Sequence, residues 1–306
     1  MLQDIEKLSS SSPRTVRDFV ASIDLSPPAS DQPMAAGGKA PANGQAALRL
    51  DAPFGMMFRR DVAADGAAAP VAKPVSGADA AGLGVTEGMQ QAYVVGSQIV
   101  SFDGEVSAAG RAAALNSFAL AQMRASKLQP DRSTPAAAFE WHAAYVNTLT
   151  QLGWVLQGGV EATQTVAQSG ATVDKALLEI AGTLLGGAAA ATLVGKVLDA
   201  LGSMSKDDPF ITVYRQRVVQ QYTVSFGASI GSGAAQNVMV RVVECAVDVR
   251  SEQLQVLFFK ADSGEARLDG RSYELALSES AYEGGRALIE AKLAGHVQAF
   301  VAQIQV

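Results

Sequence analysis

The chain has 306 residues, a formal net charge of −6 at pH 7 and an isoelectric point near 5.0. Nucleic-acid binding needs a basic stripe that releases phosphate counterions, and no such run of Lys or Arg occurs here, so we expect no nucleic-acid partner. Hydrophobic residues make up 48% of the chain and aromatic residues 6%. A sizeable core is therefore expected, built mainly from Ala, Val and Leu.

Residues with metal or redox chemistry are scarce. Cys245 is the only cysteine, and His142 and His296 are the only histidines. A single cysteine forms no intramolecular disulfide and no thiolate-only metal site, and a zinc centre would need ligands from distant segments. We therefore expect no metal and no catalytic residue, and interpret the chain as a non-enzyme. Chemistry carried by Asp and Glu alone stays open.

The N-terminal region is predicted to be an arm. Residues 1–30 lack the uninterrupted apolar stretch of a secretory signal. Residues 13–23 place Val16, Phe19, Val20 and Ile23 at helical spacing, which predicts a short amphipathic helix that either docks on something or frays. Residues 26–84 are dominated by Ala, Gly, Pro, Ser and Asp, so residues 1–86 are predicted to be largely disordered.

One apolar segment interrupts this arm. Phe54, Met56, Met57 and Phe58 lie beside two arginines. The favoured interpretation is a short segment packed on the domain, and the alternative is a docking motif for a protein partner or an export machine.

Residues 87–208 are predicted to be helical. Met89, Tyr93 and Ile99 suggest a first helix over 87–100, and residues 111–127 suggest a second that stops at Pro130. A third helix is predicted to begin at residues 133–135 and to extend to 158–159. It is expected to supply the aromatic centre of this half.

Residues 180–195 form an uncharged run of small and apolar side chains. Gly182 and Gly186 are spaced for close helix approach, and Gly187 and Gly195 add to the small-residue character. A spanning helix needs about 20 apolar residues. The favoured interpretation is a buried, closely packed helix, and the alternative is a segment that enters a membrane.

After Pro209 the periodicity changes from helical to alternating. It predicts strands at 218–226, 238–249, 253–260 and 265–275, followed by a helix over 279–294 capped by Ser278. The glycine-rich residues 227–233 lack the Lys and Ser/Thr of a phosphate loop and are interpreted as a connection between two strands. The expected fold class is α+β: a single domain over 87–306, with a helical bundle half (87–208) packed on an antiparallel β-meander with a C-terminal helix (209–306).

Cys245 lies on the predicted apolar face of the strand 238–249, with Glu244 on the opposite face. The favoured interpretation is a small core residue. The alternatives are a nucleophile, which needs a nearby base or positive field, and a lipid attachment site, which needs only an apolar cavity. A Val-rich sheet covered by an Ala/Gly helix would supply such a cavity.

The order of these features resembles a small family of bacterial virulence-associated proteins typified by the Erwinia virulence factor. The resemblance covers roughly residues 87–306 and is carried by residues 141–159, the small-residue helix, the strand at 256–260 and the closing segment 282–304. It implies a fold of helices and a β-sheet, and a cysteine that carries a fatty acyl thioester. Cys245 is the only residue here that can take that part, and the long arm is an extension beyond the family.

We therefore expect a bacterial virulence-associated or effector-like protein that acts by binding a lipid, a membrane or a protein partner. A covalent fatty acid on Cys245 is one branch of this expectation, and an unmodified core thiol is the other. The alternative is a structural or scaffold subunit that is tethered by its arm and packs with copies of itself. The expected location is the bacterial cytoplasm, with any export by a route that reads no cleaved apolar signal.

Overall fold

The computed structural model describes residues 15–25, 57–61, 74–75, 91–102, 106–166, 179–180, 182–185, 219–220, 223–232, 238–249 and 266–294. The fold class is α+β, as the sequence predicts. The longer helices are α3 (Ala108–Leu128) and α4 (Pro135–Gln151), and the shorter ones are α2 (Val16–Ser22) and α8 (Glu279–Glu283). The strands are β1 (Met57–Asp61), β2 (Pro74–Val75), β3 (Gln91–Val95), β4 (Gln98–Phe102), β5 (Trp154–Val166), β6 (Val219–Gln220), β7 (Thr223–Ser232), β8 (Met239–Val249) and β9 (Ala266–Leu277).

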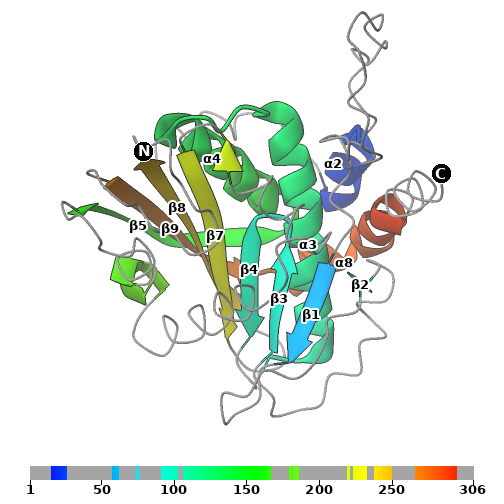
Figure 1. Cartoon of the computed structure of the whole chain (residues 1–306). Coiled ribbons are helices and arrows are strands. Elements are labelled where there is room, and N and C mark those ends of the chain that lie inside the picture. The colour runs from blue at the N-terminus through cyan, green and yellow to red at the C-terminus, as the bar shows by residue number, and fades with distance from the viewer. Residues whose placement is uncertain are drawn as a thin grey trace, which may run out of the picture.

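These strands form one sheet in the order β2-β1-β3-β4-β7-β8-β9-β5, with β6 beside β7. The predicted antiparallel meander is confirmed for β7, β8 and β9. The sheet is larger than the sequence suggests, because β4 pairs with β7 in parallel and joins the N-terminal strands to the meander. Figure 1 shows that β1, β3 and β4 continue into β7, β8 and β9 as one sheet.

Helices α3 and α4 pack against each other and cover one face of the sheet (Figure 1). α4 begins where the sequence predicts, with Thr134 accepting a hydrogen bond from the first-turn amide of Ala137. α3 begins at Ala108, before its predicted start at residue 111, because Ser107 accepts a hydrogen bond from the amide of Gly110. The core between helices and sheet is aromatic at its centre. Trp141 and Tyr145 of α4 stack with their ring centroids 5.5 Å apart, and both are fully buried. The third predicted helix therefore supplies the aromatic side chains expected of it.

The helix predicted over residues 87–100 is wrong. Residues 91–100, the described part of this range, belong to β3 and β4, a hairpin in which Val95 pairs with Gln98. The apolar positions that fit a helix are mostly β-branched or aromatic, which favours strands. Two such short runs around Gly96-Ser97 are typical of a tight hairpin.

Three other boundaries differ from the prediction. The third helix ends at Gln151, and residues up to 159 belong to β5. The glycine-rich segment lies largely inside β7, so its interpretation as a connection is wrong. The closing helix is interrupted by a turn at 284–285 before helical residues 286–294, and the Ser278 side chain makes no capping hydrogen bond.

Two short strands come from the predicted arm. β1 pairs with both β2 and β3 and extends the sheet at the end opposite to β5. Of the apolar arm segment, Met57 and Phe58 lie in β1, while Phe54 and Met56 lie outside the described residues. The favoured interpretation of this segment is a stretch packed on the domain. Its described part is a strand of the sheet. The division of the chain at Glu87 stays a prediction.

The predicted N-terminal amphipathic helix is confirmed as α2. Its four apolar side chains Val16, Phe19, Val20 and Ile23 are all buried in the main hydrophobic core. Figure 1 shows α2 beside α3 and the C-terminal helical residues. The sequence leaves open whether this helix docks or frays, and in the structure it is docked.

Candidate functional site

The strand β8 presents adjacent residues to opposite faces of the sheet. Glu244 points toward the helical layer, where its carboxylate accepts a hydrogen bond from Gln98 Nε2 at 3.0 Å. Cys245 points to the other face, opposite Gly270 of β9 and Phe226 of β7 in the strand register. Both side chains are buried, with 0% and 1% exposure respectively. The two faces around this point are the candidate sites.

On the helical face, Glu244 is the centre of a buried polar cluster. His142 of α4 lies with Nδ1 3.9 Å from Glu244 Oε2, and neither imidazole nitrogen has a hydrogen-bond partner among the described residues. The ring is enclosed by Tyr145 and Tyr273, with centroids 5.9 and 5.4 Å away. Burial, and then the positive charge of Arg271, lower the pKa of His142 to about 3. His142 is therefore neutral at physiological pH.

Two more groups belong to this buried cluster. Arg132 is buried above the Trp141 ring, 4.8 Å from its centroid, and donates to Ser97 Oγ at 3.3 Å. Burial lowers the pKa of Arg132, and the charge of Glu244 opposes that shift. Burial and the same carboxylate raise the pKa of the Tyr145 hydroxyl. A buried carboxylate and a buried guanidinium thus offset part of each other's desolvation cost.

On the opposite face, part of the predicted small-residue helix covers the sheet. Residues 179–180 and 182–185 are helical, and Ile180, Leu184 and Leu185 are buried. Side-chain carbons of Leu184 and Ile180 lie 2.5 and 2.8 Å from the point where a Cβ on Gly270 would stand. A side chain on residue 270 would force Leu184 and Ile180 to shift, so the glycine allows their close approach to β9. Because Gly270 is the cross-strand neighbour of Cys245, the thiol lies beside this contact.

The chemistry of Cys245 follows from this burial. Burial, and then the negative charge of Glu244, raise the pKa of the thiol. The neutral thiol is a poor nucleophile, since attack requires thiolate. Arg241, the nearest cation on the same face of the strand, is paired with Glu274. The structure therefore provides Cys245 with apolar neighbours and with no described activating base.

Only some of the predicted site residues are described. Gly182 is among them, and it is buried within the helical residues that cover the sheet. Gly186, Gly187 and Gly195, together with His296 and the predicted strand 253–260, lie outside the described residues. Within the part that is described, no helix is long and apolar enough to cross a membrane. No group of three or more His, Cys, Asp and Glu side chains in that part is arranged to hold a metal ion.

The polar cluster is not predicted, because the alternating pattern of β8 places Glu244 on a polar face. Both faces of β8 are covered, so the alternation of Glu with Val does not mark solvent. A signal was present: Glu244 lies within an otherwise uncharged stretch, with Val242 and Val243 before it and Cys245 to Val247 after it. A carboxylate in such a strand is expected to have buried polar partners.

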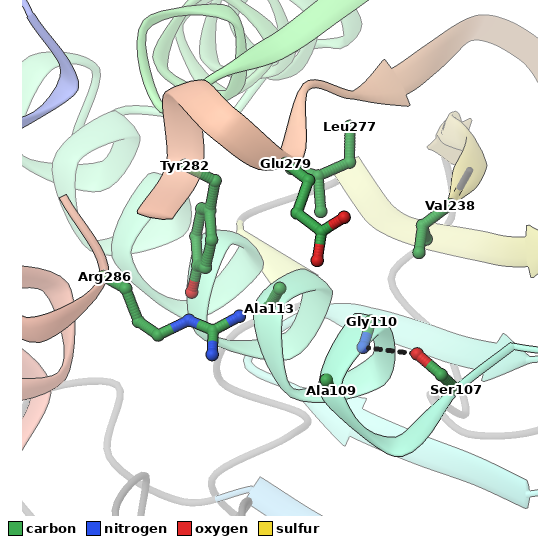
Figure 2. Close-up of a pocket in the computed structure, with 9 residues that line it drawn as sticks. All are labelled: Ser107, Ala109, Gly110, Ala113, Val238, Leu277, Glu279, Tyr282 and Arg286. Carbon is green, nitrogen blue, oxygen red and sulfur yellow. Dashed lines mark hydrogen bonds between the residues drawn. The ribbon is translucent and has the colours of Figure 1, made fainter. Parts of the chain in front are cut away.

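A small pocket lies apart from both faces, at the start of α3. Figure 2 shows Glu279 and Arg286 extending toward it, beside the Ser107 hydroxyl that caps Gly110. Its volume of about 20 Å³ has room for little more than one water molecule. It is too small for an organic ligand.

No protein-family model and no curated protein matches the chain. The solved structures with a distant likeness include the following two. One is the Evf virulence factor, 13% identical, with a TM-score of 0.27, over 60% of this chain and 67% of that chain. The other is a delta-endotoxin, 15% identical, with a TM-score of 0.28, over 69% of this chain and 89% of that chain. A virulence factor is thus among the distant neighbours, and family membership stays a prediction.

Proposed function

We propose that the chain is a virulence-associated, effector-like protein that acts by binding a lipid or membrane, and that Cys245 is its site of fatty acylation. The observation that supports this proposal is the contact of Ile180 and Leu184 with Gly270, directly beside Cys245. It puts the only thiol of the chain at an apolar interface between two layers.

The lining of this interface suits an acyl chain. The buried residues on this face of β8 and β9 are aliphatic or small, and they include Val243, Val247, Leu268 and Ser272. Ile180 and Leu184 belong to the described part of the cover, and a side-chain carbon of each lies against Gly270. Displacement of these side chains would expose both the thiol and its apolar surroundings.

The proposed modification is a thioester exchange. An acyl thioester donor approaches Cys245 after the cover has moved and the thiol has lost its proton to solvent. The Sγ–C bond then forms, the C–S bond of the donor breaks, and the donor sulfur takes up a proton. No oxidant or reductant is needed. The acyl chain would occupy the space between the sheet and the displaced cover.

Intact-mass measurement of the natively expressed protein tests this assignment. We expect a mass increase equal to one fatty acyl group, lost on treatment with neutral hydroxylamine, which cleaves thioesters. The Cys245→Ala variant is the control and should show the unmodified mass. An unmodified wild-type chain from its native host would overturn the acylation.

Membrane binding is tested separately. Dye-loaded vesicles of phosphatidylcholine and phosphatidylglycerol should release dye when the protein is added, and the acylated form should be the more active. Absence of release at every pH and lipid ratio would overturn the membrane part of the proposal. In this proposal the chain is made in the bacterial cytoplasm and is exported from the cell.

A second candidate function is a scaffold subunit. β5 is the last strand of the described sheet and spans 13 residues, with Val155 and Val160 exposed at 52% and 60%. A long edge with exposed apolar side chains favours pairing with another chain. Sedimentation at high concentration tests this function: a self-association that Val160→Lys abolishes would support it, and a monomer at every concentration would contradict it.

A further inference from the structure

The N-terminal helix α2 occupies a groove between α3 and the C-terminal helical residues 286–294. Its side chains Val16, Phe19, Val20 and Ile23 repeat at the spacing of one helix face, and their exposed fractions are 9%, 4%, 0% and 5%. They belong to the same hydrophobic cluster as Ile289 and Leu293 of the groove. The arrangement is that of an amphipathic helix bound in an apolar groove.

The floor of the groove fits this helix closely. Val16 packs on Gly285, where the point that a Cβ would occupy is already filled by the Val16 side chain. At the other side of the helix, the Arg124 guanidinium lies 4.5 Å from the centre of the Phe19 ring. Burial lowers the pKa of Arg124. The groove therefore selects an aromatic ring at this position.

The rim of the groove is basic at the end where α2 stops. Lys127 Nζ lies 2.6 Å from Asp24 Oδ2, and Lys292 Nζ donates a hydrogen bond to the Ile23 carbonyl. The C-terminal end of a helix carries partial negative charge, which cations stabilise. The groove is thus complementary to a helix with an apolar stripe and an acidic residue just after its last turn.

This docking is expected to be reversible. α2 has seven residues, too few for a stable helix in water, so its helical state depends on the groove. Burial of four apolar side chains is largely offset by the conformational entropy of ordering about ten residues. Residues 26–56 separate this segment from β1. A chain of that length, fully extended, spans up to about 100 Å, so its length alone does not hold α2 in the groove.

We propose that the groove is a helix-binding site, that α2 is its resident ligand in cis, and that a protein partner displaces α2 with an amphipathic helix of the same pattern. The partner helix carries apolar residues at i, i+3, i+4 and i+7, with an aromatic residue at the second position and a carboxylate one residue after the last. The site is separate from the Cys245 face and does not depend on acylation.

A labelled synthetic peptide of residues 15–25 tests the site on the full chain. In the Val20→Asp variant, α2 no longer fits the groove, so the peptide should bind at least tenfold more tightly than to the wild type, whose own helix competes at high effective concentration. Ala21→Asp is the matched control, because Ala21 is exposed and the same charge there leaves α2 docked. Equal peptide affinity for the two variants would overturn the proposal.

The basic rim gives a second test. Lys127→Glu in the Val20→Asp background should weaken binding of the peptide, and a peptide with Asp24→Lys should recover it. Loss of binding without this recovery would overturn the assignment of the rim. A wild-type dimer that persists in Ala21→Asp and disappears in Val20→Asp would instead assign the groove to α2 of a second copy and overturn the partner helix.

If the Val20→Asp variant does not fold, hydrogen exchange on the wild-type chain tests the proposal instead. A reversible ligand in cis opens locally, so the α2 amides should exchange at least a hundredfold faster than those at the centre of α3. If α2 and α3 exchange together in a single unfolding event, α2 is a permanent part of the core and the proposal is wrong.

Discussion

The carboxylate of Glu244 lies 3.9 Å from Nδ1 of His142, and both side chains are fully buried. An imidazole so close to a carboxylate would ordinarily gain a proton. Here burial comes first and the charge of Arg271 second, and both lower the pKa of the ring. His142 is held neutral beside an acid, which makes the fold sensitive to pH.

The buried, neutral His142 predicts that the folded protein loses stability as the pH falls. The folded-state pKa of about 3 lies below the ordinary value of 6.5. The unfolded chain therefore takes up a proton first as pH falls, and the stability due to neutral His142 is complete above about pH 6.5 and decreases below it. At pH 5 the loss is about 2 kcal/mol. Urea unfolding of wild type and His142→Phe at pH 8 and pH 5 should show this difference, and equal losses in both would contradict it.

Glu244 and Arg132 are predicted to be energetically coupled. Glu244→Gln keeps an acceptor for Gln98 but removes the negative charge that opposes the desolvation of the buried Arg132 guanidinium, at a cost of about 3 kcal/mol. In Arg132→Met the charge is already gone, so the same change should cost less. A double-mutant cycle by urea unfolding should therefore give a coupling free energy above about 1 kcal/mol. Additivity of the two substitutions would remove Arg132 from the cluster.

Thiol labelling measures how well Leu184 covers Cys245. Leu184→Ala removes the side chain that packs nearest to Gly270, so the cover opens more often and labelling should become at least roughly tenfold faster. Thr183→Ala is the matched control, because Thr183 is exposed on the same helical segment. If both variants label at the wild-type rate, these helical residues do not limit access to the thiol.

Backbone hydrogen exchange checks the strand that the sequence assigned to a disordered arm. β1 pairs with β3 over five residues and with β2 over two, so several of its amides should be protected. Arg60→Pro removes one donor and should lower the protection of the whole strand. The exchange of β8 serves as the internal reference. Exchange of residues 57–61 at the rate of an unfolded peptide would refute the pairing.

The sequence predicts the fold best where pattern and local chemistry agree. α3 and α4 have capping residues at their first turns, and β8 and β9 have long alternating stretches, so each is found close to its predicted range. α2 is also found, because Phe19 and Val20 with their neighbours fit only a helix face. These elements need little tertiary information to identify.

Prediction fails where tertiary contacts decide. Tyr93 and Ile99 fit a helical face as well as a strand, and β4 is fixed by β7, far away in the sequence. Glu244 looks solvent-exposed until α4 covers its face of the sheet. The cluster of Glu244, Gln98 and His142 comes from three elements that no local pattern connects, whereas Cys245 could be singled out because it is the only thiol.

The parallel pairing of β4 with β7 also bears on how the chain folds. Gln98 of β4 reaches Glu244 across 146 residues of sequence, and β7 lies between them in the sheet. Pairings between distant segments carry a large loop-closure entropy, so proteins that depend on them fold slowly. We expect the meander of β7 to β9 to form first and the N-terminal strands to join late. During that interval the parallel edge of β7 is open to other chains, and a chaperone or a low concentration would favour correct refolding.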